Sequence, residues 1–443
     1  MPSLLWFRRD LRLGDNPALL TARDEGPVLP LFVVDPALWR PAGQARRAYL
    51  SAALRSLDGS LRDLGGRLAV LSGDPVERVV QAAREVGAER VHLAADFGPY
   101  GRRRDEDVEA ALAQHGVEVV RTGSPYAVAP GRVRNKTGEP YKVFTPFSRA
   151  WAEHGWRAPV AAPDAAEWLT LRHGDDLPQE GWPDGMSAPP VGEAAALDRW
   201  SEFLDGALTD YDDDRDRPDR PGTSQMSPHL RWGAVHPRTL LADLGHRRST
   251  GAASYRSELA WREFYADVLF HRPDSARDYL RPELGRMDYD EPGDALDAWK
   301  AGRTGFPIVD AGMRQLLATG WMHNRVRMIT ASFLVKDLHI EWQHGARHFM
   351  RHLVDGDLAS NQHGWQWVAG SGTDAAPYFR VFNPTSQGRK FDPSGAYVRR
   401  WVPELADATD PHEPGEVDGY PAPIVDHAEE RREALARYER VRR

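Results

Sequence analysis

Two stretches near the C-terminal end decide how the rest of the sequence is interpreted: residues 320–345, GWMHNRVRMITASFLVKDLHIEWQHG, and residues 355–384, DGDLASNQHGWQWVAGSGTDAAPYFRVFNP. Both are dense in tryptophan, and the second opens with two carboxylates, Asp355 and Asp357. Such a pair can bind a metal, but metal ligands usually come with a histidine cluster or further acids at regular spacing. No such spacing accompanies this pair, so we predict no metal site.

The same two carboxylates have two other interpretations. Carboxylates accept hydrogen bonds from ribose hydroxyls and from ring N–H groups, and neighbouring indoles suit a flat redox cofactor. A tryptophan-rich helical core, in which Asp355 and Asp357 cap a helix, explains the residues equally well.

The composition is that of a soluble globular protein. The chain has 443 residues, of which 41% are hydrophobic, and this length suggests two or three domains. It contains no apolar run long enough to span a membrane and no signal-peptide pattern at the N-terminus. The absence of cysteine excludes disulfides, thiolate metal sites and thiol nucleophiles. We expect a cytoplasmic protein with no membrane partner.

Charge is distributed unevenly along the chain. The formal net charge is −8, which by itself argues against a general nucleic-acid binder. Residues 314–352, however, carry six Lys or Arg and two acids, and residues 378–401 carry five Lys or Arg and one Asp. A local basic face on an acidic protein can still hold a phosphate backbone. A solvated scatter of charges is the alternative.

The first part of the chain, residues 1–128, alternates short apolar runs with helical patterns. This alternation predicts a doubly wound parallel sheet with an α/β fold. Asn16-Pro17 is typical of a helix start, and leucines at helical spacing between residues 50 and 64 predict a helix. The predicted strands are Ser3–Phe7, Val28–Val34, Arg67–Leu71, Arg90–Ala95 and Val117–Arg121.

The remainder divides into a connection and a helical domain. Residues 129–195 are rich in Pro, Gly and Asp and predict an inter-domain linker, within which YKVFTPFSRAW is expected to pack on a domain surface. Residues 196–443 are helical. FPIVDAGMRQLLATG is a clear example, with Pro307 at its first turn and Gly320 at its C-terminal end.

The run DGDLASNQHGWQWVAGSGTDAAPYFRVFNPTSQGRKFD, residues 355–392, resembles the flavin-binding signature of the photolyase/cryptochrome family. It is most similar to the class I cyclobutane-dimer photolyases. The similarity extends from about Glu258 to Leu405 and returns in LLWFRRDLRLGDNPAL, residues 4–19. The resemblance implies an α/β antenna domain followed by an all-α domain that binds FAD.

Several FAD contacts follow from the resemblance. From the residues alone, Thr223 and Ser224 predict an N-cap for a helix that opens at Ser227, and such a helix end can hold phosphate; an ordinary capped helix is the alternative. The resemblance makes this segment the pyrophosphate site. Asn361 would face flavin N5, which favours repair over signalling. The implied FAD-binding residues are Tyr211, Thr223, Ser224, Gln225, Met226, Ser227, Arg262, Asn324, Arg327, Asp355, Gly356, Asp357 and Asn361.

A second group is implied to contact damaged DNA. Glu258 and Trp261 stand three apart and share a helix face. In the family, these positions bind a dinucleotide flipped out of the duplex, and aromatic walls with a few polar groups suit a flipped base. A surface salt bridge is the alternative for each arginine. The implied DNA-binding residues are Glu258, Trp261, Asn324, Arg325, Met328, Trp367, Arg215, Arg380, Gln387 and Lys390.

The resemblance also implies a chain of electron donors. Trp365 and Trp342 match its first two members, and Tyr289 stands where the family has a third tryptophan. Tyrosine must usually lose a proton when it gives up an electron, so Tyr289 is predicted as a terminal donor or the chain ends elsewhere. The residues implied in catalysis are Asn361, Glu258, Trp365, Trp342 and Tyr289.

An antenna site is implied in the first domain. DFGPYGRRRD, residues 96–105, follows the fourth predicted strand, on the side of a parallel sheet where ligands bind. Asp96, Gly101 and Arg104 match the family pattern for 8-hydroxy-5-deazaflavin, but Gly98 departs from it. Methenyltetrahydrofolate, or no antenna, is the alternative.

These observations predict a monomeric, FAD-dependent enzyme that uses light to repair cyclobutane pyrimidine dimers in UV-damaged DNA. His323 followed by Asn324, in place of two histidines, favours this lesion over the (6-4) photoproduct. The first alternative is a cryptochrome-type blue-light receptor without repair activity. The second is a flavoprotein without photochemistry, or a structural nucleic-acid binder.

Overall fold

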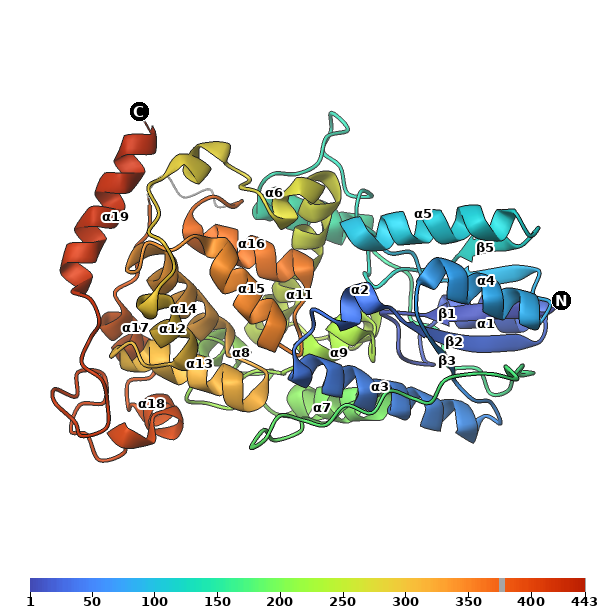
Figure 1. Cartoon of the computed structure of the whole chain (residues 1–443), viewed down its shortest axis with the longest axis horizontal. Coiled ribbons are helices and arrows are strands. Elements are labelled where there is room, and N and C mark those ends of the chain that lie inside the picture. The colour runs from blue at the N-terminus through green and yellow to red at the C-terminus, as the bar shows by residue number, and fades with distance from the viewer. Residues whose placement is uncertain (374–378, 443) are drawn as a thin grey trace.

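The computed structural model describes residues 1–373 and 379–442. The first part is a five-stranded parallel sheet in the order β3-β2-β1-β4-β5 (Figure 1). The predicted α/β fold followed by a helical domain is confirmed. The strands are β1 Ser3–Phe7, β2 Val28–Val34, β3 Ala69–Ser72, β4 Arg90–Leu93 and β5 Glu118–Arg121. The helices between them are α1 Pro17–Glu25, α2 Pro36–Trp39, α3 Gln44–Asp63, α4 Pro75–Glu85 and α5 Pro99–Ala113.

Four predicted strand boundaries shift by two residues or fewer; one is the end of the third strand, at Ser72 instead of Leu71. The third strand starts later because the Leu68 N–H donates to Asp58 Oδ1, 2.9 Å away. The fifth starts one residue later because the Val117 N–H donates to Leu112 O and closes the end of α5. The fourth ends at Leu93, before the predicted Ala95.

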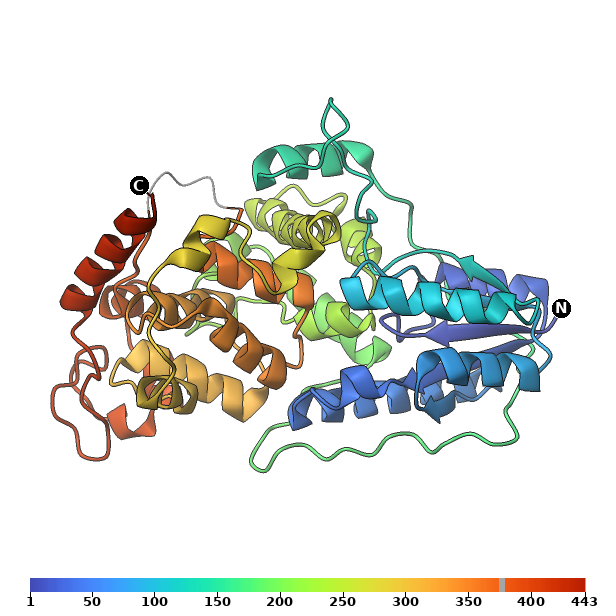
Figure 2. The ribbon, with the colours of Figure 1, turned by 45° about the horizontal axis from the view of Figure 1, so that its top comes forward.

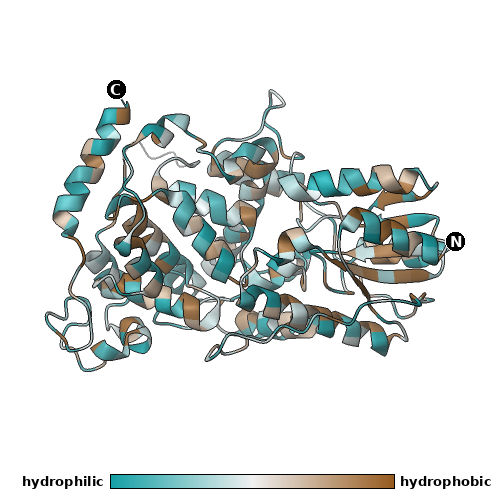
Figure 3. Cartoon of the chain, in the orientation of Figure 1, coloured by the Kyte–Doolittle hydropathy of each residue, from teal (hydrophilic) through white to brown (hydrophobic). Residues whose placement is uncertain are grey.

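Both faces of the sheet are buried, as expected for parallel strands covered by helices. Leu5 and Phe7 of β1 pack with α1 and α3 on one face, and Leu4 and Trp6 pack with α4 and α5 on the other. The strands are largely brown in Figure 3, whereas α5 is largely teal. Period-two alternation of β1 therefore supplies two separate cores.

The second part is a bundle of helices, with α19 at the far side from the sheet. Its helices surround two cores, one built on α11 and one on α13 to α16. Gly320 ends α13 in the left-handed conformation, φ 66°, as predicted. Among the described residues, no helix is long and apolar enough to cross a membrane. The helices are α7 Glu193–Asp205, α8 Tyr211–Asp214, α9 Ser227–Trp232, α10 Pro237–Leu244, α11 Thr250–His271, η1 Pro273–Ala276, η2 Pro282–Arg286, α12 Asp294–Ala301, α13 Pro307–Thr319, α14 Asn324–Lys336, α15 Trp342–His352, α16 Leu358–Ala369, α17 Pro384–Phe391, α18 Ala396–Trp401, η3 Pro403–Leu405 and α19 His427–Arg442.

The predicted linker contributes to both parts. Its helix α6, Phe144–His154, buries Phe147 and Trp151 against the helical core. Further on, Trp168 returns to the first domain, where its Nε1–H donates to Leu64 O at 2.9 Å. Figure 2 shows this later segment running along the outside of α3. The domain limits 1–128, 129–195 and 196–443 stay a prediction.

Buried polar bonds join the sheet domain to the helical domain. Arg238 of α10 pairs with Asp15 at 2.7 Å, and both side chains are buried. The Glu193 carboxylate accepts from the N–H groups of Leu13 and Gly14 at 2.7 and 2.8 Å. The loop after β1 is thereby fixed against the second domain, and this loop also reaches the site described next.

Candidate functional site

A deep cavity opens within the helical domain, enclosing about 2170 Å³ when its open mouth is counted. All of the predicted FAD-binding residues line it, and so do eight of the ten predicted DNA-binding residues. The two exceptions, Gln387 and Lys390, lie on α17 outside this lining. Residues that were scattered over 170 positions of sequence therefore meet at one site, although their roles stay predictions.

The segment Thr223–Ser227 corrects the predicted cap. The residue at the N-cap of α9 is Met226, without a side-chain capping bond, instead of Thr223 or Ser224. The Ser224 hydroxyl bonds the Tyr255 hydroxyl at 2.8 Å and accepts from the Met226 N–H at 3.3 Å. Ser224 thus fixes the turn before the helix and does not cap it, because its hydroxyl is already engaged by Tyr255 and the Met226 N–H.

Two features hold this turn in an uncommon shape. Gln225 has φ 54°, a left-handed conformation that non-glycine residues seldom adopt and that clusters at functional sites. Arg199 of α7 donates to the carbonyl oxygens of Ser224 and Thr223, both at 3.0 Å. The backbone of the predicted pyrophosphate segment is therefore fixed from behind by an arginine that the sequence did not indicate.

The two carboxylates are held by arginines. Asp355 accepts from Arg327 Nη2 at 2.8 Å, which is the predicted pair. Asp357 Oδ2 pairs at 2.6 Å with Arg9, which comes from the sheet domain. Asp357 also caps α16, since its Oδ1 accepts from the Ser360 N–H at 3.1 Å. The capping interpretation is thus correct for Asp357, and the same residue also lines the cavity.

Positive charge exceeds negative charge at this end of the cavity. Burial would raise the pKa of Asp357, but Arg9, Arg231 and Arg262 together hold it well below its ordinary value. Burial, with Arg9 and Arg46 nearby, lowers the pKa of Arg231. Such a set of cations favours an anionic ligand.

Three buried polar atoms on the cavity wall have no hydrogen-bond partner among the described residues: Arg231 Nη1, Asp355 Oδ1 and Trp365 Nε1. Buried polar groups are nearly always satisfied, so atoms left open in this way indicate a ligand. Arg231 is otherwise fixed, because its Nε donates to Gly356 O at 2.8 Å. The wall fits a ligand that carries both anionic and hydrogen-bonding groups.

Asn361 presents a defined atom to the cavity. Its amide nitrogen donates to Ala346 O at 3.1 Å and to Gln362 Oε1 at 2.7 Å. A backbone carbonyl can only accept, so the nitrogen must face Ala346. The side-chain oxygen of Asn361 is then the atom left to accept a hydrogen bond from a ligand.

The mouth of the cavity carries the predicted DNA-binding residues. Glu258 and Trp261 lie on one face of α11, and Glu258 pairs with Arg215 at 2.6 Å. The Trp261 ring stacks on Phe144 of α6, with centroids 3.7 Å apart and planes 7° apart. Arg325 pairs with Asp216 at 2.6 Å. The salt-bridge alternative therefore describes both arginines in this structure.

The basic stretches are partly neutralised in the fold. Arg314 pairs with Glu404, and Arg389 pairs with Asp410 and Glu413. Charge counted along the sequence overestimates the positive surface, because distant acids fold back onto these arginines.

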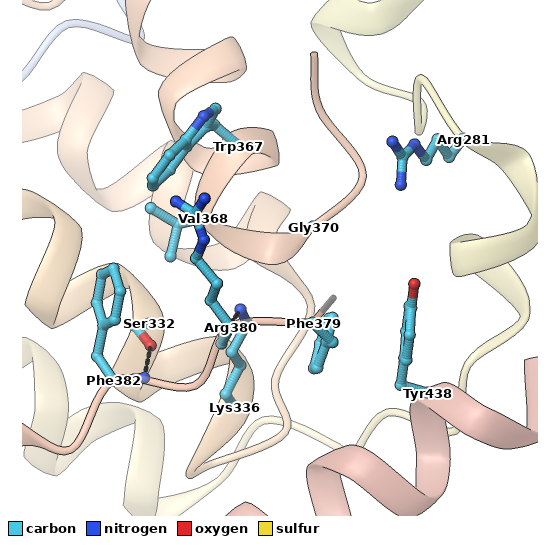
Figure 4. A pocket seen from close by; sticks show the side chains of 10 residues that line it. All are labelled: Arg281, Ser332, Lys336, Trp367, Val368, Gly370, Phe379, Arg380, Phe382 and Tyr438. Atoms are coloured by element: carbon cyan, nitrogen blue, oxygen red, sulfur yellow. Dashed lines mark hydrogen bonds between the residues drawn. The ribbon is translucent and has the colours of Figure 1, made fainter. Parts of the chain in front are cut away.

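A smaller hollow, about 440 Å³ when its open space is counted, lies beside the mouth. Figure 4 shows Arg380 beside Trp367, with its guanidinium 5.4 Å from the ring centroid. Lys336 lies 4.2 Å from the centroid of Phe379. Trp367 and Arg380 line both the hollow and the large cavity, so they connect the two spaces.

The predicted electron donors form part of an aromatic core. Trp365 lines the cavity and packs so closely on Gly345 that a side chain there would overlap its ring. Trp342 lies about one turn before Gly345 on α15 and is fully buried. The ring that meets Trp342 edge-on, at 6.1 Å, is Tyr279, and Tyr289 stacks on Tyr279 at 6.3 Å. Tyr279 was missed because no family position indicated it.

The predicted antenna residues bond one another. Arg104 pairs with Asp96 at 3.3 Å and with Asp105 at 2.8 Å. Gly101 lies against the Asp96 carboxylate, where a side-chain carbon would overlap it. These contacts account for the three residues within the fold, and the antenna stays a prediction.

The sequence analysis missed four further residues of the cavity region. Arg9, Arg46, Arg231 and Trp321 surround the carboxylates and the α9 turn; Trp321 Nε1–H donates to Ser227 Oγ at 3.2 Å. Arg9 stood inside the motif LLWFRRDLRLGDNPAL, which was the available signal. Trp321 stood in the tryptophan-rich stretch 320–345, and nothing local in the sequence marks Arg46 or Arg231.

Known proteins resemble this chain over its whole length. Residues 3–164 match a family model described as DNA photolyase, and residues 255–440 match the FAD binding domain of DNA photolyase. The deoxyribodipyrimidine photo-lyase of Streptomyces griseus is 43% identical over 456 residues, covering 99% of both chains. A class III photolyase structure from Agrobacterium tumefaciens has a TM-score of 0.94 at 39% identity, covering 100% of this chain and 98% of that one. A Synechocystis sp. PCC6803 cryptochrome structure has a TM-score of 0.90 at 27% identity, covering 99% of both.

Proposed function

Because this chain belongs to the DNA photolyase family, we propose that it is an FAD-dependent deoxyribodipyrimidine photo-lyase that repairs cyclobutane pyrimidine dimers in DNA. The observation that carries the proposal is one cavity with two different ends. Its inner end is lined by arginines and carboxylates, and its mouth by aromatic rings. The first suits a charged cofactor, and the second suits a flipped dinucleotide.

FAD fits the inner end. We assign its phosphates to Arg231 and to the segment Thr223–Ser227, where Arg231 Nη1 lacks a partner among the described residues. Asp355 and Asp357 would accept hydrogen bonds from the ribose or ring N–H groups. When bound, FAD supplies the light-driven electron transfer that splits the dimer. The protein holds and orients both molecules.

Asn361 would face flavin N5. Its side-chain oxygen is left to accept a hydrogen bond, because its amide nitrogen is engaged by Ala346 O. A neutral amide imposes no charge on the ring, so it tolerates more than one protonation state of the cofactor. An acid at this position would favour protonation, and this difference supports repair over signalling.

At the mouth, Glu258 would hydrogen-bond the base edges of the dimer and Trp261 would stack on it. One face of Trp261 is covered by Phe144, which supports the ring, so a base would stack on the opposite face. Burial raises the pKa of Glu258, although the nearby Arg215 opposes this shift. Asn324, Met328 and Trp367 complete the pocket.

DNA outside the lesion would be held through its phosphates. Arg215, Arg325 and Arg380 line the mouth, and Gln387 and Lys390 lie on the neighbouring α17. Phosphate contacts position a protein without reading sequence, which suits a lesion that occurs in any context.

Three finer assignments belong to the same proposal. We assign the chain to class I, although it is also 39% identical to a class III photolyase structure. We assign 8-hydroxy-5-deazaflavin as the antenna, held near Asp96, Gly101 and Arg104; methenyltetrahydrofolate or no antenna is the alternative. We expect a monomer. The chromophore released from purified protein would test the antenna assignment. The mass of the protein in solution would test whether it is a monomer.

The decisive experiment measures the loss of thymine dimers from a UV-damaged oligonucleotide, with reduced protein, in blue light and in the dark. We expect loss in the light only. If no dimer is lost while FAD is bound and reduced, the chain is a photoreceptor of the cryptochrome type.

Replacing Trp365 tests the proposed electron path. Trp365→Phe should abolish light-driven reduction of the bound flavin, followed by absorbance, because the indole that lines the cavity is the first donor. Trp299→Phe is the matched control. The Trp299 ring also packs on Trp365, with ring centroids 6.1 Å apart, but Trp299 is not a member of the proposed electron path. Photoreduction that survives in Trp365→Phe, or that is lost only in Trp299→Phe, would show that the path is wrong.

A further inference from the structure

The aromatic core continues beyond Trp342 to a tyrosine that the sequence did not indicate. Tyr279, in the loop between η1 and η2, meets the Trp342 ring edge-on at a centroid distance of 6.1 Å and an angle of 86°. Its hydroxyl donates to Glu341 Oε1 at 3.1 Å. A phenol therefore lies between a buried indole and a carboxylate.

The indoles inside the protein cannot release a proton when oxidised. Trp365 Nε1 and Trp342 Nε1 are buried and have no hydrogen-bond partner among the described residues. An oxidised indole there has no base to accept its proton, so it keeps its positive charge until an electron arrives. The first group along this path with a base attached is Tyr279.

Among the described residues, Tyr289 hydrogen-bonds no carboxylate directly; its side-chain partner is Tyr279. It stacks on Tyr279 at 6.3 Å, but its hydroxyl donates to the backbone oxygen of Leu284 at 3.2 Å. A peptide carbonyl is too weak a base to take a proton from an oxidised phenol. Burial also raises the pKa of Tyr289 to about 12. Tyr289 is thus a poor place for the charge to end.

Glu341 is well placed to accept the proton. It directly precedes α15, and its side chain makes no capping bond to that helix. The Glu341 carboxylate therefore does not cap the helix, as side chains at this position often do. It is half-buried, so it remains in contact with solvent. Burial, the neighbouring Tyr289 and Glu341 raise the pKa of Tyr279, so its phenol keeps its proton until it is oxidised.

We propose that Tyr279 is the terminal electron donor of this chain and that Glu341 accepts its proton. This inference rests on the proposed function, because the oxidant is the light-excited, oxidised flavin of a photolyase. One electron leaves Trp365 for that oxidant, Trp342 restores Trp365, and Tyr279 restores Trp342. The Tyr279 phenol loses its proton to Glu341 in the same step. The products are a neutral tyrosyl radical and a protonated carboxyl group, and both indoles are unchanged.

The test is an electron paramagnetic resonance spectrum of the FAD-loaded protein, frozen under blue light. With ring-deuterated tyrosine, the wild type should give a narrowed tyrosyl signal. Tyr279→Phe should lose this signal. Tyr141→Phe is the matched control, because Tyr141 packs on Phe147 of α6, away from the path, and it should keep the signal. A signal that survives in Tyr279→Phe, or that is lost in Tyr289→Phe, overturns the assignment. FAD content and melting temperature establish that each variant is folded.

Glu341→Gln tests the proton acceptor and retains the shape of the side chain. Recovery of the oxidised Trp342, followed by transient absorbance, should slow by about 100-fold, the order of magnitude that a positioned proton acceptor supplies. In the wild type this recovery should also slow in D₂O, and the variant should lose that dependence. Unchanged recovery in Glu341→Gln removes Glu341 from the proposal. Dimer repair by the chemically reduced wild type, measured alongside, tests the proposed function separately.

Discussion

The two ends of the cavity hold their charges in different ways. At the inner end, Asp355 and Asp357 have side-chain exposures of 1% and 13%, and their partners come from both domains. At the mouth, Glu258 and Asp216 are 31% and 32% exposed, and each pairs with a single arginine. Distances are similar at the two ends, so exposure is the difference. The inner end is therefore a permanent structure, whereas the pairs at the mouth would exchange partners with DNA in the proposed complex.

The reason is the cost of moving charges out of water. Buried ions lose several kcal/mol of solvation each, and their mutual attraction repays this only when every partner is present. Exposed pairs lose little and gain little. A phosphate would replace Asp216 at Arg325 with a small change in energy, but loss of Asp357 would leave Arg9 without its ion-pair partner.

The largest effect is expected from Asp357→Asn. This change removes the anion beside Arg9 and Arg231 together with a charged cap of α16, and we expect a loss of about 3–5 kcal/mol of unfolding free energy. FAD should be lost on purification. Thermal unfolding and the ratio of FAD to protein measure both effects. Asp410→Asn, which breaks the exposed pair with Arg389, should leave the unfolding free energy nearly unchanged. Equal losses in the two variants would abolish the distinction between the ends.

An intermediate effect is expected from Trp261→Ala. Stacking of a base on an aromatic side chain contributes about 1–3 kcal/mol, so affinity for an oligonucleotide with one dimer should fall by that amount. Affinity for undamaged duplex should stay nearly constant, since no base is flipped there. Trp401→Ala, on α18, is the control for loss of an indole. An equal loss of affinity for damaged and undamaged DNA would show that Trp261 does not contact the lesion.

The smallest effect is expected from Arg325→Gln. Loss of one phosphate contact should weaken binding to damaged and undamaged DNA alike. It should also lower the magnitude of the slope of log K against log salt concentration by about 1. Arg314→Gln is the matched control, because the Arg314–Glu404 pair, at 2.7 Å against 2.6 Å for Arg325–Asp216, has similar exposure but lies outside the cavity lining. A salt dependence that changes equally in both variants would show that Arg325 makes no specific contact.

Much of the fold follows from local signals. Short apolar runs mark the strands, and Asn16, Pro307 and Gly320 mark helix ends because their backbone preferences act within one turn. Where a tertiary bond competes, the prediction fails. The Ser224 hydroxyl is used by Tyr255 on α11, 31 residues away, so the cap predicted from neighbouring residues does not form.

The sequence by itself determined the two-part architecture and the residue types of the site, because periodicity, caps and the carboxylate motif are carried by neighbours along the chain. Only the tertiary structure decided which charges meet. Arg9 reaches Asp357 across 348 positions, and Tyr279 reaches both Trp342 and Glu341 from a loop without regular structure. A charge or a proton acts through distance in space, and that distance is set by packing, which no local pattern records.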